Sequence, residues 1–303
     1  MSDPSIRLRC MTFVMRVLAK PLLARFGTPE RAQRDFARLA PLLFRPPKGT
    51  IVVDGGPYAQ VTWGTPNEGQ AVLYLHGGAF VAGSRHSYSA MGGRLAKRTG
   101  ATVFVADYPK LQTAPFPAAP NAVLAAWDHL LAQGWLPHQI VLAGDSAGGN
   151  LVFGLFATLL QRGQKPAGVL AFSPWTDLTL SGDSIQANAK KDSILPANRM
   201  EEAVGLYLAG ADPADPMASP LFADFPDPSP VLIQVGADEV LFSDAQRIAD
   251  KVNATLDIWD HVPHVWQLFE GRLPEANAAM DRASDFIQTS FESANRNPTA
   301  SAT

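Results

Sequence analysis

From residue 50 onward, short apolar runs alternate with stretches whose apolar side chains recur every three or four residues. The runs AVLYL, ATVFVADY, QIVLAG, AGVLAF, PVLIQVG and ATLDIWD have the length of strands and are mostly apolar on both faces. Helix-like stretches such as PNAVLAAWDHLLAQG and FSDAQRIADKV separate them. Because neighbouring parallel strands need a long connection, this alternation predicts an α/β fold with a mostly parallel central sheet and helices on both faces.

Charge and cysteine content narrow the classes of function. The formal net charge is only -3 and charged residues make up 17% of the chain, so we expect no polyanion-binding surface and no nucleic-acid partner. The single cysteine, Cys10, cannot form an internal disulfide. This fits a reducing compartment, and we expect the protein to be cytoplasmic.

The first segment, IRLRCMTFVMRVLAKPLLARF, is apolar but interrupted by Arg9, Arg16 and Lys20. No stretch approaches the ~18 apolar residues of a membrane span, so stable membrane insertion is not expected. The segment predicts an amphipathic helix. It either packs on the body of the protein or contacts a membrane reversibly.

The stretch AGDSAGGN places Gly144, Ser146 and Gly148 as G-x-S-x-G between an expected strand and an expected helix. The turn must be sharp enough to strain the serine backbone by ~1 to 3 kcal/mol, and bulky flanking residues would collide with the strand or helix. We therefore predict that Ser146 is a nucleophile. A tight turn rich in small residues is the alternative.

A serine hydroxyl needs a neighbouring base, and in this class of sheet the chain order is serine, acid, histidine. Only His261 and His264 follow Ser146, both in WDHVPHVWQLF after the last expected strand. We favour His264, because Pro263 would hold the backbone before it rigid. A metal site at this HxxH is not expected, since no clear third ligand lies nearby.

The acid is expected on the loop after the preceding strand, where VLIQVGADEVLFSD offers Asp238, Glu239 and Asp244. Asp238 comes directly after the strand and its glycine, so a short side chain could reach the imidazole. Glu239 is expected to point the other way. Asp244 resembles a residue at a helix N-terminus whose oxygen serves backbone amides. We therefore favour Asp238.

The stretch HGGAF follows a strand and exposes main-chain amides. An oxyanion is stabilised by such N–H groups, each worth ~3 to 4 kcal/mol, and side chains would block them. We predict that Gly77 and Gly78 donate, with Ala147 as a third donor. His76 is expected to brace the loop by hydrogen bonding, and a simple hairpin bend is the alternative for the glycine pair.

The motifs HGGAF, GDSAGG, FPAA, SPWTDL, GADEVLFSDA and HVPHVWQLF follow one another in this order within residues 50 to 292. In this combination the chain resembles the bacterial hormone-sensitive-lipase family of α/β-hydrolase esterases, in the branch with a GDSAG elbow. The resemblance implies an α/β-hydrolase fold with a helical cap and the triad Ser146, Asp238 and His264. It also implies the same three oxyanion donors, no metal, no organic cofactor and a homodimer.

The resemblance also implies a division of the chain. The N-terminal helices and an insertion between two strands would form the cap, and the α/β-hydrolase catalytic domain would comprise two segments. Separately, the end of the chain is small and polar without apolar periodicity, so we expect it to be disordered. These parts are residues 1–48 (N-terminal cap helices), 49–177 and 213–293 (catalytic domain), 178–212 (cap insertion) and 294–303 (tail).

Two departures from the family pattern stand out. Many relatives carry Y-R-L-A-P-E before FPAA, but this chain has YPKLQTAPFPAA, so the arginine and the glutamate are missing. Ala79 occupies the position of the third glycine of the usual HGGG. We expect the ion pair of the missing arginine and glutamate to be absent or replaced. The change at residue 79 is expected to alter the shape of the pocket rather than to abolish activity.

The expected function is a serine carboxylesterase that hydrolyses short- to medium-chain esters through an acyl-enzyme, with a small-molecule ester as substrate. The candidate apolar pocket residues, which could equally be ordinary core, are Phe80, Val81, Met200 and Tyr207. A lactone hydrolase or a deacetylase could use the same triad, and amide or carbamate hydrolysis is a further alternative. A non-catalytic binding protein on a hydrolase fold is the alternative from another class.

Overall fold

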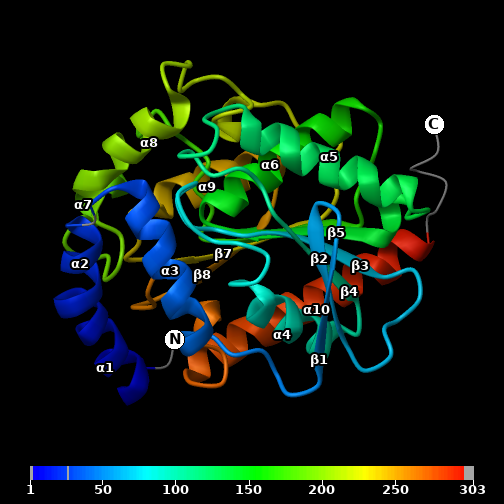
Figure 1. Ribbon diagram of the computed structural model, residues 1–303, viewed down its shortest axis with the longest axis horizontal. Coiled ribbons are helices and arrows are strands. Elements are labelled where there is room, and N and C mark those ends of the chain that lie inside the picture. Colours follow the sequence, from blue (N-terminus) through cyan, green and yellow to red (C-terminus); the bar gives the residue numbers. More distant parts are fainter. Residues whose placement is uncertain (1–2, 26, 297–303) are drawn as a thin grey trace.

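The computed structural model describes residues 3–25 and 27–296, and these form a layered α/β structure around one sheet (Figure 1). Within the described residues the sheet has eight strands in the order β1-β2-β4-β3-β5-β6-β7-β8. β1 and β2 form an antiparallel hairpin and β2 pairs antiparallel with β4, whereas all pairs from β4 to β8 are parallel. The strands are β1 Thr50–Gly55, β2 Tyr58–Trp63, β3 Ala71–Leu75, β4 Thr102–Ala106, β5 Ile140–Asp145, β6 Gly168–Phe172, β7 Val231–Gly236 and β8 Thr255–Trp259.

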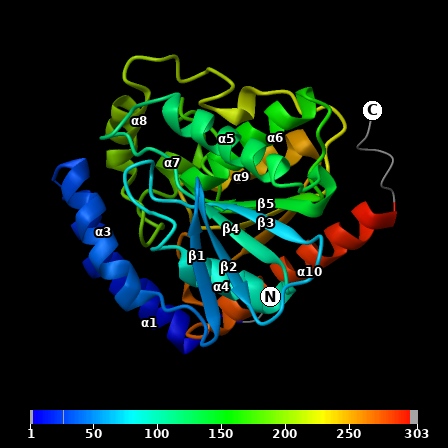
Figure 2. The ribbon, with the colours of Figure 1, turned by 45° about the vertical axis from the view of Figure 1, so that its right-hand side comes forward.

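Helices cover both faces of the sheet, as Figures 1 and 2 show: α4 and α10 lie on one face, and α5, α6 and α9 on the other. The α-helices are α1 Ile6–Val14, α2 Lys20–Ala24, α3 Pro29–Leu43, α4 Ser89–Thr99, α5 Ala118–Ala132, α6 Ala147–Gln161, α7 Ser184–Ala187, α8 Met200–Leu208, α9 Phe242–Val252 and α10 Pro274–Arg296. A π-helical turn, η1 Met15–Ala19, joins α1 to α2. Short 3-10 turns are η2 Pro137–Gln139, η3 Ala197–Arg199, η4 Pro220–Phe222 and η5 Trp266–Phe269. The predicted α/β-hydrolase architecture is confirmed.

The central strands are apolar on both faces because both faces are covered. In β3, Leu73 and Leu75 belong to the core under α5 and α6, whereas Val72 and Tyr74 belong to the core under α4 and α10. Successive side chains of a strand point to opposite faces, so one short run of sequence supplies both cores.

The parallel register brings the carboxyl ends of four strands to one edge. Asp145 of β5 is paired with Phe172 of β6, Phe172 with Gln234 of β7, and Gly236 of β7 with Trp259 of β8. The loops that follow these strands therefore meet there, where ligands of open α/β sheets bind.

The N-terminal helices contact the segment between β6 and β7. Lys20 Nζ donates to the carbonyl oxygens of Ala189 (2.6 Å) and Asp192 (2.7 Å), and Arg16 donates to that of Lys191 (2.9 Å). Two segments far apart in the sequence are thus joined at one end of the molecule. Within the described ranges, no helix has the length and apolar character needed to cross a membrane.

The end of the chain differs from the expectation. Residues 294–296 complete α10, so the prediction that disorder begins at residue 294 is wrong for these three residues. α10 buries one face, including Ile287 and Phe291, against the sheet, and this packing carries the helix further than the small, polar sequence indicates. The remainder of the predicted tail, residues 297–303, lies outside the described residues.

Candidate active site

Ser146 lies between β5 and α6 with φ +53° and ψ -121°, a strained conformation for a residue with a side chain. Its N–H donates to the Phe172 carbonyl oxygen (2.9 Å), and the Trp175 N–H donates to the Ser146 carbonyl oxygen (3.1 Å). These bonds fix the turn to the end of β6. A Cβ added at Gly144 would lie 2.6 Å from the carbonyl oxygen of Leu75, and one at Gly148 would overlap the same atom. The predicted reason for both glycines is confirmed.

His264 lies on the loop after β8, and its Nδ1 is 2.5 Å from Oε2 of Glu239. Both side chains are buried, at 8% and 1% exposed. Burial disfavours the protonated imidazole, but the adjacent Glu239 carboxylate outweighs this effect and raises the pKa of His264 above its usual value. An imidazole held in this way has one fixed tautomer, with Nε2 left to accept a proton.

The prediction that Asp238 orients His264 is wrong. Asp238 Oδ2 is 3.1 Å from Nδ1 of His261, which is 62% exposed. Glu239, expected to point away, instead turns back over the end of β7, because its N–H bonds to the Gly236 carbonyl oxygen (3.1 Å) in a tight turn. Its Oε1 accepts from the Gly236 N–H (2.6 Å). The longer side chain reaches from this position to His264.

Asp244 serves backbone amides as expected, but not those of its own helix. Its Oδ2 accepts from the N–H groups of Thr176 and Asp177 (2.9 Å each), which follow β6. Burial raises the pKa of Asp244 to about 7, against the opposing effect of these backbone hydrogen bonds. Asp244 therefore anchors a loop and leaves the imidazole to Glu239.

Three residues that the sequence reasoning missed hold Glu239 and its loop. Ser173 follows β6, and its hydroxyl donates to Glu239 Oε1 (2.7 Å). Asn188 Nδ2 donates to the carbonyl oxygens of Ala237 (3.0 Å) and Glu239 (2.9 Å). Asp192 Oδ2 accepts from the N–H of Val240 (3.0 Å). Asn188 and Asp192 belong to the insertion, so this segment supports Glu239 and its loop. Nothing in the local sequence pattern of the insertion indicated these contacts.

The oxyanion prediction also needs one correction. The Gly77 N–H donates to Oδ1 of Asp145 (3.0 Å), so this amide is already used. In the described part of the chain, the N–H groups of Gly78, Ala79 and Ala147 have no acceptor. Gly78 and Ala79 have positive φ values of +120° and +53°, and successive N–H groups in such conformations can form an anion-binding concavity. The loop thus offers Gly78 and Ala79, with Ala147 at the start of α6.

Asp145, directly before Ser146, is the anchor of this loop. Oδ1 accepts from Tyr74 (2.8 Å) and from the Gly77 N–H, and Oδ2 accepts from Tyr88 (2.9 Å). Burial raises the pKa of Asp145 to about 6, and its three hydrogen bonds oppose that effect. A Cβ at Gly77 would overlap the Asp145 carboxylate. Glycine is therefore required at residue 77 for close approach to a carboxylate rather than to an oxyanion.

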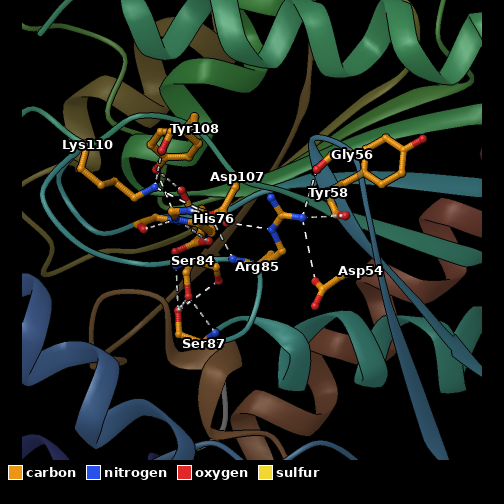
Figure 3. Close-up of polar contacts among 12 residues, drawn as sticks. Asp54, Gly56, Tyr58, His76, Ser84, Arg85, Ser87, Asp107, Tyr108 and Lys110 are labelled. Carbon is orange, nitrogen blue, oxygen red and sulfur yellow. Dashed lines mark hydrogen bonds and ion pairs between the residues drawn. The ribbon is translucent and has the colours of Figure 1, made fainter. Parts of the chain in front are cut away.

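His76 makes the bracing contact expected of it (Figure 3). Its Nδ1 is 2.8 Å from the Gly77 carbonyl oxygen, and its buried ring stacks on Tyr108 with centroids 4.4 Å apart. The Tyr108 hydroxyl donates to the His76 carbonyl oxygen (2.6 Å). Burial lowers the pKa of His76, so the neutral ring acts as a structural support.

The segment that departs from the family pattern has its own polar contacts. Lys110 is 5% exposed, donates to the Tyr108 carbonyl oxygen (2.5 Å) and lies 3.9 Å from Asp107 (Figure 3). Burial lowers the pKa of Lys110 to about 8, partly opposed by Asp107. Arg85 also binds Asp107, at 2.8 Å. An ion-pair network is thus present without the arginine and glutamate of the Y-R-L-A-P-E pattern.

Of the four candidate pocket residues, two are in direct ring contact and the other two lie in or against the same apolar cluster. Phe80 stacks face to face on Tyr207 of α8, with centroids 3.8 Å apart and planes 6° apart. Met200 is buried in the same apolar cluster, and Val81 is half-buried against it. The Tyr207 hydroxyl is buried without a hydrogen-bond partner in the described part of the chain. The stack joins the oxyanion loop to the insertion.

The fold and this site define a class: an α/β hydrolase with a strained serine, an imidazole–carboxylate pair and free main-chain amides at one sheet edge. A family model described as an alpha/beta hydrolase fold matches residues 72–268. An acetyl-hydrolase of Streptomyces hygroscopicus is 34% identical, over 86% of this chain and 87% of the relative. An esterase of Acinetobacter venetianus is also 34% identical, over 72% of this chain and 74% of the relative.

Solved structures of similar proteins indicate a particular family within the α/β-hydrolase fold. An esterase from the bacterial hormone-sensitive lipase family is 32% identical with a TM-score of 0.88, covering 96% of this chain and all of that chain. The chain belongs to the bacterial hormone-sensitive-lipase family of carboxylic ester hydrolases within the α/β-hydrolase fold.

Proposed function

We propose that Ser146, His264 and Glu239 hydrolyse short-chain carboxylic esters through an acyl-enzyme. The observation that carries the proposal is the buried His264–Glu239 pair, 2.5 Å apart, on the sheet edge where the strained Ser146 is held. A buried imidazole–carboxylate pair beside a strained serine turn is typical of a catalytic site rather than of a structural histidine.

Each residue has one role in the proposed cycle. His264 Nε2 takes the hydroxyl proton as Ser146 attacks the ester carbonyl, and Glu239 stabilises the imidazolium that results. The N–H groups of Gly78, Ala79 and Ala147 stabilise the oxyanion. The imidazolium then protonates the leaving alcohol, and water repeats the sequence on the acyl-enzyme.

The proposal requires that Ser146 and His264 meet when substrate binds. Among the described residues they share no hydrogen bond. Catalytic hydrogen bonds of this kind are often long before substrate binds and tighten in the Michaelis complex. The paired strand ends support the approach, because the loops carrying both residues leave the same edge.

The site favours short acyl groups. The Phe80–Tyr207 stack joins the loop of Gly78 and Ala79 to the insertion, and we infer that it limits the room for a long acyl chain. The acetyl-hydrolase relative supports the same preference. A series of p-nitrophenyl esters from about two to sixteen carbons tests it, and fastest turnover of the longest chains would contradict it.

Deacetylation of an acetylated compound is the second candidate, favoured by that relative's name. It uses the same residues on the same kind of bond. A substrate panel containing acetylated sugars and lactones beside linear esters distinguishes it, since a deacetylase would prefer the acetylated sugars by kcat/KM.

A non-catalytic role is tested by covalent labelling. A fluorophosphonate should add to the wild type with the mass of one adduct, and Ser146→Ala should remain unlabelled. A wild type that resists labelling would favour a binding protein.

We further infer that residues 1–48 and 178–212 act as the cap over a catalytic domain of residues 49–177 and 213–293. The bonds from Lys20 and Arg16 to the insertion support this division. Limited proteolysis tests this division. We expect cleavage to release the first 48 residues and to increase the access of substrate to the site.

We also infer a homodimer through an edge strand and a cytoplasmic location. Exposed apolar side chains on the edge strands, Ile51 and Val53 of β1 and Ile258 of β8, support the first inference. The free, exposed Cys10 fits the second. Light scattering during gel filtration tests the dimer, and cell fractionation tests the location.

A further inference from the structure

Charge is distributed unevenly along this chain. Residues 1–45 contain nine Lys and Arg but only three Asp and Glu, whereas the rest of the chain contains sixteen and twenty-five. The first 45 residues thus carry a net charge of +6 within a protein of net charge -3. No acidic residue lies between Asp3 and Glu30. The overall net charge of -3, from which we expected no polyanion-binding surface, conceals this asymmetry, and an asymmetry of this kind indicates a surface that meets an anionic partner.

The same segment exposes an unusual amount of apolar side chain. Half of the large hydrophobic residues that the described chain exposes lie within its first 43 residues: Ile6, Phe13, Val14, Val17, Leu18, Leu22, Leu39, Leu42 and Leu43. Ile6 is 80% exposed, Phe13 66% and Leu18 65%. Scattered apolar residues are normal on a surface, but a concentration marks an interaction site.

The apolar residues of α1 and η1 form a stripe. Ile6, Phe13 and Val17 recur at intervals of seven and four residues, so they share one face of the helix. The opposite face holds Leu8, which is 1% exposed and packs against Val262 and Trp266. The helix therefore has an apolar side toward the protein and another toward solvent.

Cations border this stripe. Arg9 and Arg16, seven residues apart, lie on one flank and are exposed, as is Arg7. A cavity of about 320 Å³ beneath α1 is lined by Arg9, Phe13, Arg16 and Lys191 among others. A second cavity, about 280 Å³, is lined by Leu22 and Leu39 with Arg25, Arg31, Arg38, Asp35 and Gly27. Apolar and cationic groups thus alternate over α1, η1, α2 and α3.

We propose that this N-terminal face, the exposed side of α1, η1, α2 and α3, docks reversibly on an anionic lipid surface. Its exposed apolar side chains enter the boundary between headgroups and acyl chains, and its cations bind the lipid phosphates. Figure 1 shows α1, α2 and α3, the dark blue ribbons, together at one side of the molecule, and α1 and α3 lie on the same side in Figure 2.

Charge decides between a lipid surface and a second copy of this chain. In a symmetric dimer the same patch contacts itself, so two surfaces of net positive charge would face each other. An anionic bilayer is complementary to that charge. The net negative charge of the remaining residues turns the rest of the protein away from the bilayer and so orients it.

Docking would place the cap beside the membrane. Lys20 binds the main chain at Asp192, and the Asp192 side chain binds the loop that carries Glu239. Asp192 therefore links the surface proposed to meet lipid with the loop that carries Glu239, the proposed acid. Binding itself does not depend on the proposed esterase activity.

Vesicle flotation of the full chain tests the proposal. The lipids are phosphatidylcholine alone and phosphatidylcholine mixed with phosphatidylglycerol. We expect about tenfold more bound protein on the anionic vesicles at low salt, and loss of most of that excess at high salt. No binding to anionic vesicles, or equal binding to both compositions, would overturn the proposal.

Two variants and a matched control locate the surface. Phe13→Ser/Val17→Ser/Leu18→Ser should reduce bound protein about tenfold or more. Leu136→Ser/Leu206→Ser/Met217→Ser, which removes three similarly exposed apolar residues elsewhere, should bind as the wild type does. Arg7→Gln/Arg9→Gln removes two exposed cations and should lower the ratio of protein bound to anionic vesicles over neutral vesicles at least twofold. This variant keeps all the apolar side chains, so it tests the surface even if the triple variant folds poorly. Equal losses in the control and the triple variant would contradict the assignment.

Two further measurements separate the outcomes. Hydrolysis of soluble p-nitrophenyl acetate should be the same for all three variants, so failure of docking is distinguishable from failure of the esterase. Sedimentation measures the oligomeric state and so tests the alternative that this face binds a second copy of the chain. A triple variant that changes from dimer to monomer, with a wild type that ignores vesicles, would assign the face to self-association and overturn the proposal.

Discussion

The carboxylate of Asp145 accepts a hydrogen bond from the main-chain N–H of Gly77, across 3.0 Å. Asp145 is directly before the strained Ser146, and Gly77 is directly before the two amides proposed for the oxyanion. One buried side chain thus links the proposed nucleophile to the proposed oxyanion donors. Tyr74 and Tyr88 hold that carboxylate in place.

Asp145→Asn should therefore impair catalysis more than binding. The amide replaces one acceptor oxygen with an NH2 group that faces a hydrogen-bond donor, so the oxyanion loop loses an anchor. We expect kcat to fall about tenfold or more, with KM changed less than about twofold. A lowered Tm with unchanged kcat would show a purely structural role. Tyr88→Phe, which removes one donor and leaves the carboxylate, should have a smaller effect.

Glu239→Gln and Asp238→Asn form a matched pair of substitutions on adjacent residues. The first removes the charge that stabilises the His264 imidazolium, and we expect kcat to fall by about two to four orders of magnitude. The second changes a carboxylate whose hydrogen-bond partner in the described chain is the exposed His261, so kcat should stay within about twofold. Steady-state hydrolysis of p-nitrophenyl acetate decides between them, and the reverse order of effects would restore Asp238 as the acid.

The pH dependence of kcat/KM follows from the raised pKa of His264. As the pH falls through that pKa, the imidazole takes up a proton and can no longer accept the proton of Ser146. The acidic limb of the profile should therefore have its midpoint above 6.5, the usual histidine value. In Glu239→Gln the limb should move to lower pH, because the charge that favours the imidazolium is gone. A limb that does not move would mean that another group titrates.

Tyr207 should control the length of the acyl chain. Tyr207→Ala removes the ring that stacks on Phe80, and we expect the kcat/KM ratio of octanoate to acetate esters to rise about tenfold or more. Tyr207→Phe is the control, because it keeps the ring and removes only a buried hydroxyl without a partner in the described chain. It should leave the ratio unchanged and the protein as stable or more so. An unchanged ratio in Tyr207→Ala would place the acyl pocket elsewhere.

Periodicity and local turn chemistry were enough to predict the strands, the covered faces of the sheet and the serine turn. The small residues follow from the turn itself, since a Cβ at Gly144 would lie 2.8 Å from the Gly148 carbonyl oxygen of the same motif. These features depend on residues near one another in the sequence.

Contacts between distant segments were harder to predict. Asp238 and Glu239 are adjacent acids in one loop, and a hydrogen bond from the Glu239 N–H to Gly236 decides which of them faces His264. Gly77 was predicted to serve an oxyanion, but a carboxylate 68 positions later along the chain takes its N–H. Ser173, Asn188 and Asp192 support Glu239 and its loop from two other loops, whose proximity only the fold reveals.

The most direct test is a crystal structure of the protein after reaction with a phosphonate ester. We expect a covalent bond from Ser146 Oγ to phosphorus and a phosphoryl oxygen about 3 Å from the amide nitrogens of Gly78, Ala79 and Ala147. Nε2 of His264 should lie within hydrogen-bond distance of Ser146 Oγ, with Glu239 still on Nδ1. A phosphoryl oxygen bound by Gly77, or His264 held by Asp238 and remote from Ser146, would contradict it.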